Sequence, residues 1–331
     1  MKYWMITNRN ETDDSLGPKR RALTYWTSDD SKPVKLSKWT KCPPKDFKRA
    51  LISAADQFPA LKASGENQSQ KHVTLFIHGY NNDWPETVER YQSICRDIFE
   101  GDAGLGTCVL FSWPSNGRVT DYLPDRADAA GSGVDLADVL CELYDWLLLK
   151  QKEAAKNPLD ACRAKTSIIA HSMGNYVLQK AMQSCWTRNN QPLLVSLITQ
   201  LLMVAADVDN DLFKGGETSD KTDGDAIANL TYRVTALYNR NDDVLACSAG
   251  LKHFGKRRLG RSGLDRTDPP SDNVWDFDCT ALVPPESGDP HSAYFNVGKE
   301  HPVTNLIRDI LRGVDHEIIQ GRYAKPVSAS G

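Results

Sequence analysis

Short apolar segments alternate with longer amphipathic segments through the middle of this 331-residue chain. Residues 72–77, 107–112 and 166–170 are typical of buried strands, whereas 84–99 and 134–151 carry apolar residues at helical spacing. Strands that alternate with helices pair in parallel, because each helix carries the chain back across the sheet. The pattern therefore predicts an α/β fold with a doubly wound, mostly parallel sheet and helices on both faces.

Weaker patterns extend this prediction towards both ends of the chain. Further strands are expected at residues 2–7, 22–27, 201–206, 231–238 and 274–279, and further helices at 45–63 and 303–311. Residues 213–229 and 252–273 show no periodicity and are expected to be loops. Because the chain has no internal repeat and no linker, we expect one domain over residues 1–323, to which the first 70 residues belong, and a flexible tail at 324–331.

The composition excludes several classes of partner. With 40 basic and 43 acidic residues, the chain offers no charge excess that would attract nucleic acid or an anionic membrane. The longest largely apolar segment, 193–206, is too short and too polar to span a bilayer, and the first residues do not resemble a signal peptide. The eight cysteines are scattered singly, without the spacing of a zinc site or a disulfide framework. We therefore expect a cytoplasmic protein without metal or cofactor, and the sequence leaves its oligomeric state open.

The segment Ala170-His171-Ser172-Met173-Gly174 lies where a strand must give way to a helix, because apolar residues recur at helical spacing from Val177 to Cys185. A nucleophilic serine of the GxSxG type occupies such a turn, where small neighbours let strand and helix approach and leave Oγ exposed. Ala170 replaces the first glycine and adds a single methyl group. We therefore predict that Ser172 is an exposed catalytic nucleophile.

Three other segments accompany this turn in the sequence: His78-Gly79-Tyr80-Asn81-Asn82, Phe111-Ser112-Trp113-Pro114-Ser115 and Ala206-Asp207-Val208-Asp209. Together with the serine segment, they resemble the α/β-hydrolase superfamily, and more narrowly a bacterial hydrolase family of undetermined substrate. The resemblance covers residues 1–311. It implies the α/β-hydrolase fold and catalytic residues in the chain order serine, acid, histidine.

A serine hydroxyl needs a base within hydrogen-bond reach and an acid that orients the base. The resemblance implies an acid after the strand at 231–238, where Asp242 fits the register better than Asp243. Asp207, which follows the preceding strand, is the alternative, because some relatives carry the acid there.

Seven histidines compete for the role of base. His72 and His78 precede the serine, and His171 adjoins it and is expected to project away from it, so chain order and geometry exclude all three. His291 follows the last predicted strand and precedes the last predicted helix, as the base loop of the family does. His301 lies at the start of that helix, so His291 is the predicted base.

The resemblance also implies an oxyanion hole made by the backbone amides of Tyr80 and Met173. Asn81 and Asn82 either add side-chain donors or build the turn. Trp113 either lines the substrate pocket or packs in the core.

The expected activity is that of a serine hydrolase, a carboxylesterase that acts on a small-molecule ester through an acyl-enzyme. An amidase, a thioesterase or a peptidase would use the same groups, and a non-catalytic binding module would share the fold. The basic segment 252–266 is expected to be a solvated loop rather than an anion site.

Overall fold

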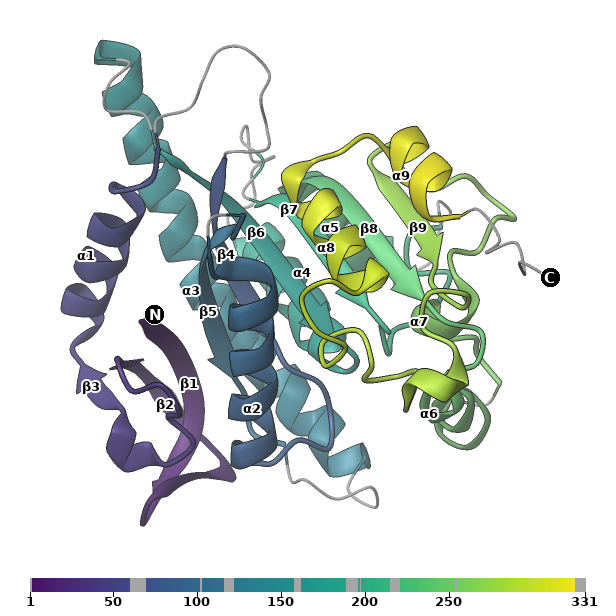
Figure 1. The fold of residues 1–331 in the computed structure, drawn as a ribbon, viewed down its shortest axis with the longest axis horizontal. Coiled ribbons are helices and arrows are strands. Elements are labelled where there is room, and N and C mark those ends of the chain that lie inside the picture. Colours follow the sequence, from purple (N-terminus) through teal and green to yellow (C-terminus); the bar gives the residue numbers. More distant parts are fainter. Residues whose placement is uncertain are drawn as a thin grey trace.

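The computed structural model describes residues 2–59, 70–101, 103–115, 122–157, 162–188, 196, 198–214, 221–253 and 255–324. Nine strands of this part form one sheet in the order β3-β2-β1-β5-β4-β6-β7-β8-β9 (Figure 1). The strands are β1 (Tyr3–Thr12), β2 (Ser15–Ser28), β3 (Thr40–Cys42), β4 (Lys71–Ile77), β5 (Gly106–Ser112), β6 (Ala164–His171), β7 (Ile198–Val204), β8 (Thr231–Tyr238) and β9 (Val274–Asp278). The α-helices are α1 (Pro44–Ala55), α2 (Trp84–Ile94), α3 (Tyr122–Lys156), α4 (Gly174–Arg188), α5 (Lys221–Leu230), α6 (Asp243–Cys247), α7 (Leu259–Ser262), α8 (Pro302–Arg312) and α9 (His316–Tyr323).

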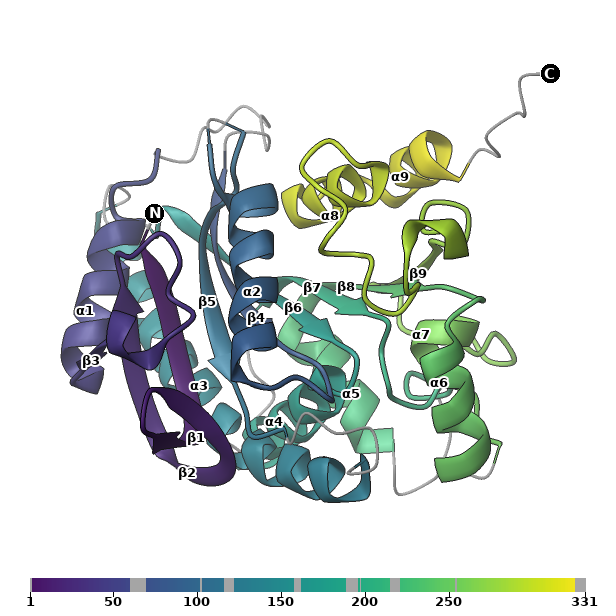
Figure 2. The same cartoon turned by 60° about the horizontal axis from the view of Figure 1, so that its bottom comes forward.

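The sheet is mostly parallel. In the part of the sheet β1-β5-β4-β6-β7-β8-β9, every neighbouring pair of strands is parallel. Strand β2 runs antiparallel to its neighbours β1 and β3. Figure 2 shows β1 and β2 together at the edge of the sheet that lies far from β9. The predicted doubly wound, mostly parallel α/β fold is confirmed.

Side chains of the central strands alternate between two hydrophobic clusters, one on each face of the sheet. In β4, for example, Ile77 joins the cluster covered by α1, α3, α4 and α5, whereas Phe76 joins the cluster covered by α2, α8 and α9. Figure 1 shows α2 and α8 in front of the sheet and α3 and α4 behind it. Burial of each such side chain stabilises the fold by about 2 kcal/mol. Because both faces of the sheet carry apolar side chains, helices must cover both faces to bury them.

The chain order creates a crevice at the carboxyl ends of β4 and β6. β4 lies between β5 and β6, so the chain moves one way across the sheet through α2 and then reverses through α3. Because such crossovers are right-handed, the reversal places α2 and α3 on opposite faces. In open α/β sheets, ligands bind where the helices diverge in this way. The segments that follow β4 and β6, which begin at His78 and Ser172, meet at this point.

Several predicted element boundaries are wrong. The helix predicted at 45–63 ends at Ala55 in α1, and α3 begins at Tyr122 rather than near residue 134. Gly131 and Gly133 obscure the start of α3 in the sequence. A methyl group at Gly133 would lie 2.6 Å from Lys180 Cβ, so the glycine lets α3 pack closely on α4.

The two segments expected to be loops also contain helices. Residues 213–229 include most of α5, and residues 252–273 include α7. Helix α9 follows the helix predicted to be the last. Residues 325–331 of the predicted tail and the predicted helical residues 60–63 lie outside the described residues. No helix of the described part is both long and apolar enough to cross a membrane.

Candidate active site

Ser172 occupies a sharp turn between β6 and α4. Its φ is 52°, a left-handed conformation that costs a non-glycine residue about 1 kcal/mol or more. The Asn175 amide secures the turn by donating hydrogen bonds to Ala170 O (2.9 Å) and Ser172 O (3.1 Å). A methyl group at Gly174 would come within 2.5 Å of the backbone after β4, so glycine is required for this close approach. The strand, turn and helix predicted around Ser172 are therefore present.

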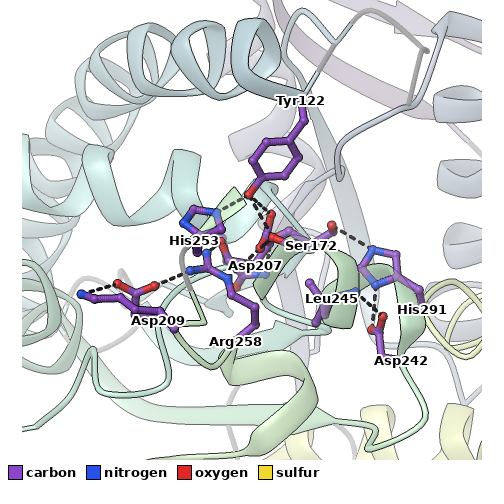
Figure 3. A network of polar contacts seen from close by, with 12 residues as sticks. Tyr122, Ser172, Asp207, Asp209, Asp242, Leu245, His253, Arg258 and His291 are labelled. Carbon is purple, nitrogen blue, oxygen red and sulfur yellow. Dashed lines mark hydrogen bonds and ion pairs between the residues drawn. The ribbon is translucent and has the colours of Figure 1, made fainter. Parts of the chain in front are cut away.

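Three side chains from separate loops form a continuous chain of hydrogen bonds (Figure 3). Ser172 Oγ lies 2.9 Å from His291 Nε2, and His291 Nδ1 lies 2.7 Å from Asp242 Oδ2. The second carboxylate oxygen of Asp242 accepts a hydrogen bond from Leu245 N (2.9 Å) and caps α6. The three residues are at most 7% exposed. The arrangement has the geometry of a nucleophile, a base and an orienting acid.

The environment of His291 determines which form of its ring is favoured. Burial alone would lower the pKa of His291, but the Asp242 carboxylate and its hydrogen bond, with smaller contributions from Asp289 and Asp207, raise it above 6.5. Asp242 therefore both orients the ring and stabilises its protonated form, which a general base becomes after it accepts a proton.

The loop that carries His291 is anchored on both sides. Beyond it, Tyr294 and Phe295 are buried in the cluster of α2, α8 and α9. Behind it, His171 Nε2 lies 2.9 Å from the backbone oxygen of His291, and the two rings are 5.0 Å apart. Burial, together with Arg90, holds the pKa of His171 well below its usual range, so its neutral ring donates to that oxygen. The sequence reasoning excluded His171 as a base and missed this contact.

Asp207, the alternative acid, forms its hydrogen bonds with residues other than His291. Its carboxylate accepts hydrogen bonds from Tyr122 OH (2.7 Å) and Arg258 Nε (2.8 Å), as Figure 3 shows, and from Ser248 Oγ (2.8 Å). Burial alone would raise the pKa of Asp207, but these three partners hold it below its usual range. His291 Nδ1 donates its hydrogen bond to Asp242 instead. Asp207 is therefore buried, and its described hydrogen bonds go to residues other than His291.

The basic segment 252–266 is not simply a solvated loop. Arg258 is fully buried and also pairs with Asp209, which Lys256 contacts as well (3.2 Å). Arg266 pairs with Asp276 of β9, the strand at one edge of the sheet. The expectation holds for Lys256, Arg257 and Arg266, which are exposed, and is wrong for Arg258, because its acidic partners lie about 50 positions earlier in the chain, on the loop after β7.

The turn after β4 is built from buried polar groups. His78 stacks on Trp113 with ring centroids 5.3 Å apart and contacts Gly79 O (2.8 Å). The Asn82 amide donates to Gly79 O (3.1 Å) and Tyr80 O (2.9 Å), so Asn82 builds the turn. Trp113 is fully buried and packs in the core. These contacts fix the segment from His78 to Asn82, in which Gly79 approaches Ser172 so closely that a methyl group there would lie 2.8 Å from Ser172 Cβ.

A cleft of about 750 Å³ opens beside Ser172. Its lining includes Tyr80, Asn81 and Asn82 from the turn after β4, together with residues of α2, α6 and the His291 loop. Small-molecule sites commonly have volumes of about 300–1,000 Å³. Ser172 is only 3% exposed, so the prediction of an exposed serine is wrong, because the loops after β4, β8 and β9 surround the turn. Within the described residues, no group of three or more histidine, cysteine or acidic side chains is arranged to hold a metal ion.

Known proteins resemble this chain at several levels. An uncharacterized protein of Nostoc sp., alr1448, is 27% identical over 135 residues, which are 34% of this chain and 31% of that protein. The chain thus matches about a third of the length of this relative.

Three solved structures are similar at low identity. A candidate cell surface hydrolase from Lactobacillus plantarum is 8% identical, with a TM-score of 0.35, and the match covers 78% of this chain and 98% of that chain. An acylaminoacyl peptidase from Pyrococcus horikoshii is 12% identical, with a TM-score of 0.31, and the match covers 93% of this chain and 51% of that chain. A hormone-sensitive lipase from a metagenome library is 14% identical, with a TM-score of 0.32, and the match covers 85% of this chain and 94% of that chain. At these identities and TM-scores they say nothing about the chemistry of this chain.

The family assignment comes from the sequence match. Residues 55–273, about two thirds of the chain, match the model of a family described as an alpha/beta hydrolase of unknown function, DUF900. This range includes β4 to β8, the turn at Ser172 and Asp242. The expected resemblance is confirmed, and the chain belongs to the DUF900 family of α/β hydrolases of unknown function.

Proposed function

We propose that this protein is a serine carboxylesterase that forms an acyl-enzyme on Ser172. The observation that carries the proposal is the unbroken hydrogen-bonded chain from Ser172 Oγ through His291 to Asp242 beside a cleft of small-molecule size. A serine hydroxyl becomes an effective nucleophile when a histidine can take its proton as the oxygen attacks.

In the proposed reaction, Ser172 Oγ attacks the ester carbon while its proton passes to His291 Nε2. Asp242 holds the Nδ1 proton and stabilises the imidazolium. The amides of Tyr80 and Met173 donate to the oxyanion, and the Met173 amide lies where the N-terminus of α4 favours negative charge. His291 then returns the proton to the departing alkoxide, and water releases the acyl group by the reverse sequence.

The proposal includes a small-molecule substrate, no cofactor and a cytoplasmic location. All eight cysteines are free thiols, which is common in a reducing compartment. Amide and thioester substrates would use the same groups, so a substrate panel must include them.

A fluorophosphonate probe tests the proposal directly, because it phosphonylates an activated serine. We expect the wild-type protein to be labelled and to hydrolyse activated esters, with slower reactions on matched amides and thioesters. Intact-mass analysis and peptide mapping should place the label on Ser172. A folded wild-type protein that is neither labelled nor active on any member of the panel would instead be a non-catalytic binding module.

Ester hydrolysis should rise with pH through the pKa of His291. The base must be neutral to accept the serine proton, and Asp242 raises the pKa of His291, so the midpoint should lie above 6.5. His291→Ala should abolish both the activity and the pH-dependent rise. His301→Ala serves as the control, because His301 caps α8 through a hydrogen bond from Val303 N (3.2 Å). A wild-type midpoint well below 6.5, or one that moves in His301→Ala, would contradict the assignment.

A further inference from the structure

Arg90 extends from α2 into the cleft that contains Ser172. Its side chain is partly buried, and its guanidinium meets two neutral partners, His171 Nδ1 at 3.2 Å from Nη1 and Ser292 Oγ at 3.4 Å from Nη2. Arg90 Nε is buried and has no hydrogen-bond partner among the described residues. The guanidinium therefore has hydrogen-bonding capacity that the protein leaves unused.

No described carboxylate forms an ion pair with Arg90. By contrast, Arg258 is fully buried and pairs with both Asp207 and Asp209. A buried charge without a close counter-ion is costly, and a planar carboxylate matches the forked donors of arginine. The difference between the two arginines indicates that the counter-ion of Arg90 comes from outside the chain.

The more distant acidic groups do not replace that counter-ion. Burial lowers the pKa of Arg90, and Glu86 and Asp289 only partly offset this. Glu86, Glu89 and Asp289 are exposed at the cleft, where water and salt screen their charge over about 8 Å at physiological ionic strength. Asp243, which also lines the cleft, is exposed and screened in the same way.

We propose that Arg90 forms a carboxylate subsite and that the preferred substrates are esters that carry a free carboxylate. This inference rests on the proposed esterase function and names the substrate class of the same cleft. Because Nε is buried, the carboxylate would bind the remaining N–H groups of Arg90 Nη1 and Nη2 while the ester carbon lies at Ser172 Oγ. The subsite would also explain why Arg90 contacts His171 and Ser292, because these contacts hold the guanidinium at the cleft without neutralising it.

The first test compares matched pairs of esters. Monomethyl succinate, glutarate and adipate carry the carboxylate on the acyl side, and the butanoyl ester of glycolate carries it on the alcohol side. Each is paired with a methyl or ethyl ester of equal length without the charge. We expect at least one charged ester to exceed its neutral partner in kcat/KM by roughly tenfold or more, as a charge-assisted pair implies. A wild-type preference for the neutral ester in every pair would overturn the proposal.

Variants separate a binding role from a purely structural role. Arg90→Gln should lower kcat/KM for the charged ester roughly 10- to 100-fold more than for its neutral partner, and Arg90→Lys should retain part of the preference. Arg96→Gln is the matched control, because Arg96 is exposed and already pairs with Asp97 (2.7 Å). Equal losses on both esters in Arg90→Gln would mean that Arg90 only supports the His291 loop, and the subsite would be wrong.

A binding measurement distinguishes failure of the subsite from failure of the esterase function. Calorimetry with succinate, glutarate and adipate should detect binding to the wild type and to Ser172→Ala but weaker binding to Arg90→Gln. If no ester is hydrolysed but a dicarboxylate binds through Arg90, the esterase function fails and the subsite stands. If esters are hydrolysed without a charge preference and no dicarboxylate binds, the subsite fails and the esterase function stands.

Discussion

Ser172→Ala should lower ester hydrolysis by about ten thousand-fold or more, because enzymes with this arrangement depend steeply on the nucleophile. The substitution removes Oγ, which is the atom that would form the acyl-enzyme and the partner of His291 Nε2. Labelling by the fluorophosphonate probe should disappear with the activity. Initial rates on one activated ester and gel-based labelling measure both effects.

The Ser172→Ala protein should remain folded, and this is the control for the experiment. Alanine and serine both carry a Cβ, so the left-handed turn at φ 52° is strained equally in both proteins. Only one hydrogen bond is lost, which is worth about 1 kcal/mol. Circular dichroism and thermal unfolding should therefore match the wild type closely. Unchanged turnover in a folded Ser172→Ala protein would contradict the assignment of the nucleophile.

Asp242→Asn should lower kcat by about 100- to 10,000-fold, since an amide that donates to His291 Nδ1 favours the imidazole tautomer that cannot accept the serine proton. The cap of α6 should survive, because the asparagine oxygen can still accept from Leu245 N. Loss of the carboxylate should also lower the pKa of His291, so residual activity should have a lower midpoint. A pH series of kcat measures both changes.

Asp207→Asn provides the contrasting variant. It leaves buried Arg258 without one of its two carboxylate partners, which should destabilise the fold by about 3 kcal/mol while folded molecules keep most of their activity. Rates normalised to the folded fraction, taken from urea unfolding, separate the two effects. A larger loss per folded molecule in Asp207→Asn than in Asp242→Asn would place the orienting acid after β7 instead of β8.

Periodicity predicted the central parallel strands well, because strands buried on both faces must be continuously apolar. It failed where a tertiary contact outweighs local preference. The start of α3 contains Gly131 and Gly133, which weaken an isolated helix, and Gly133 is explained only by the close packing of α4. In α5, a methyl group at Gly224 would lie 2.0 Å from Leu212 O. This glycine is therefore also required by a tertiary contact, which the local sequence does not reveal.

The sequence by itself determined the α/β fold and the turn at Ser172, whereas the chain order serine, acid, histidine was an implication of the resemblance to α/β hydrolases. The fold and the turn depend on short-range patterns and on the positions of strand ends, which the chain carries locally. The resemblance favoured Asp242 and kept Asp207 as the alternative, and only the tertiary structure shows that His291 pairs with Asp242 and that Arg258 pairs with Asp207. The choice depends on which partners surround each carboxylate, and His291 and Arg258 come from 49 and 51 positions further along the chain. Arg90 likewise carries no local signal, since its lack of a counter-ion is a property of the folded cleft.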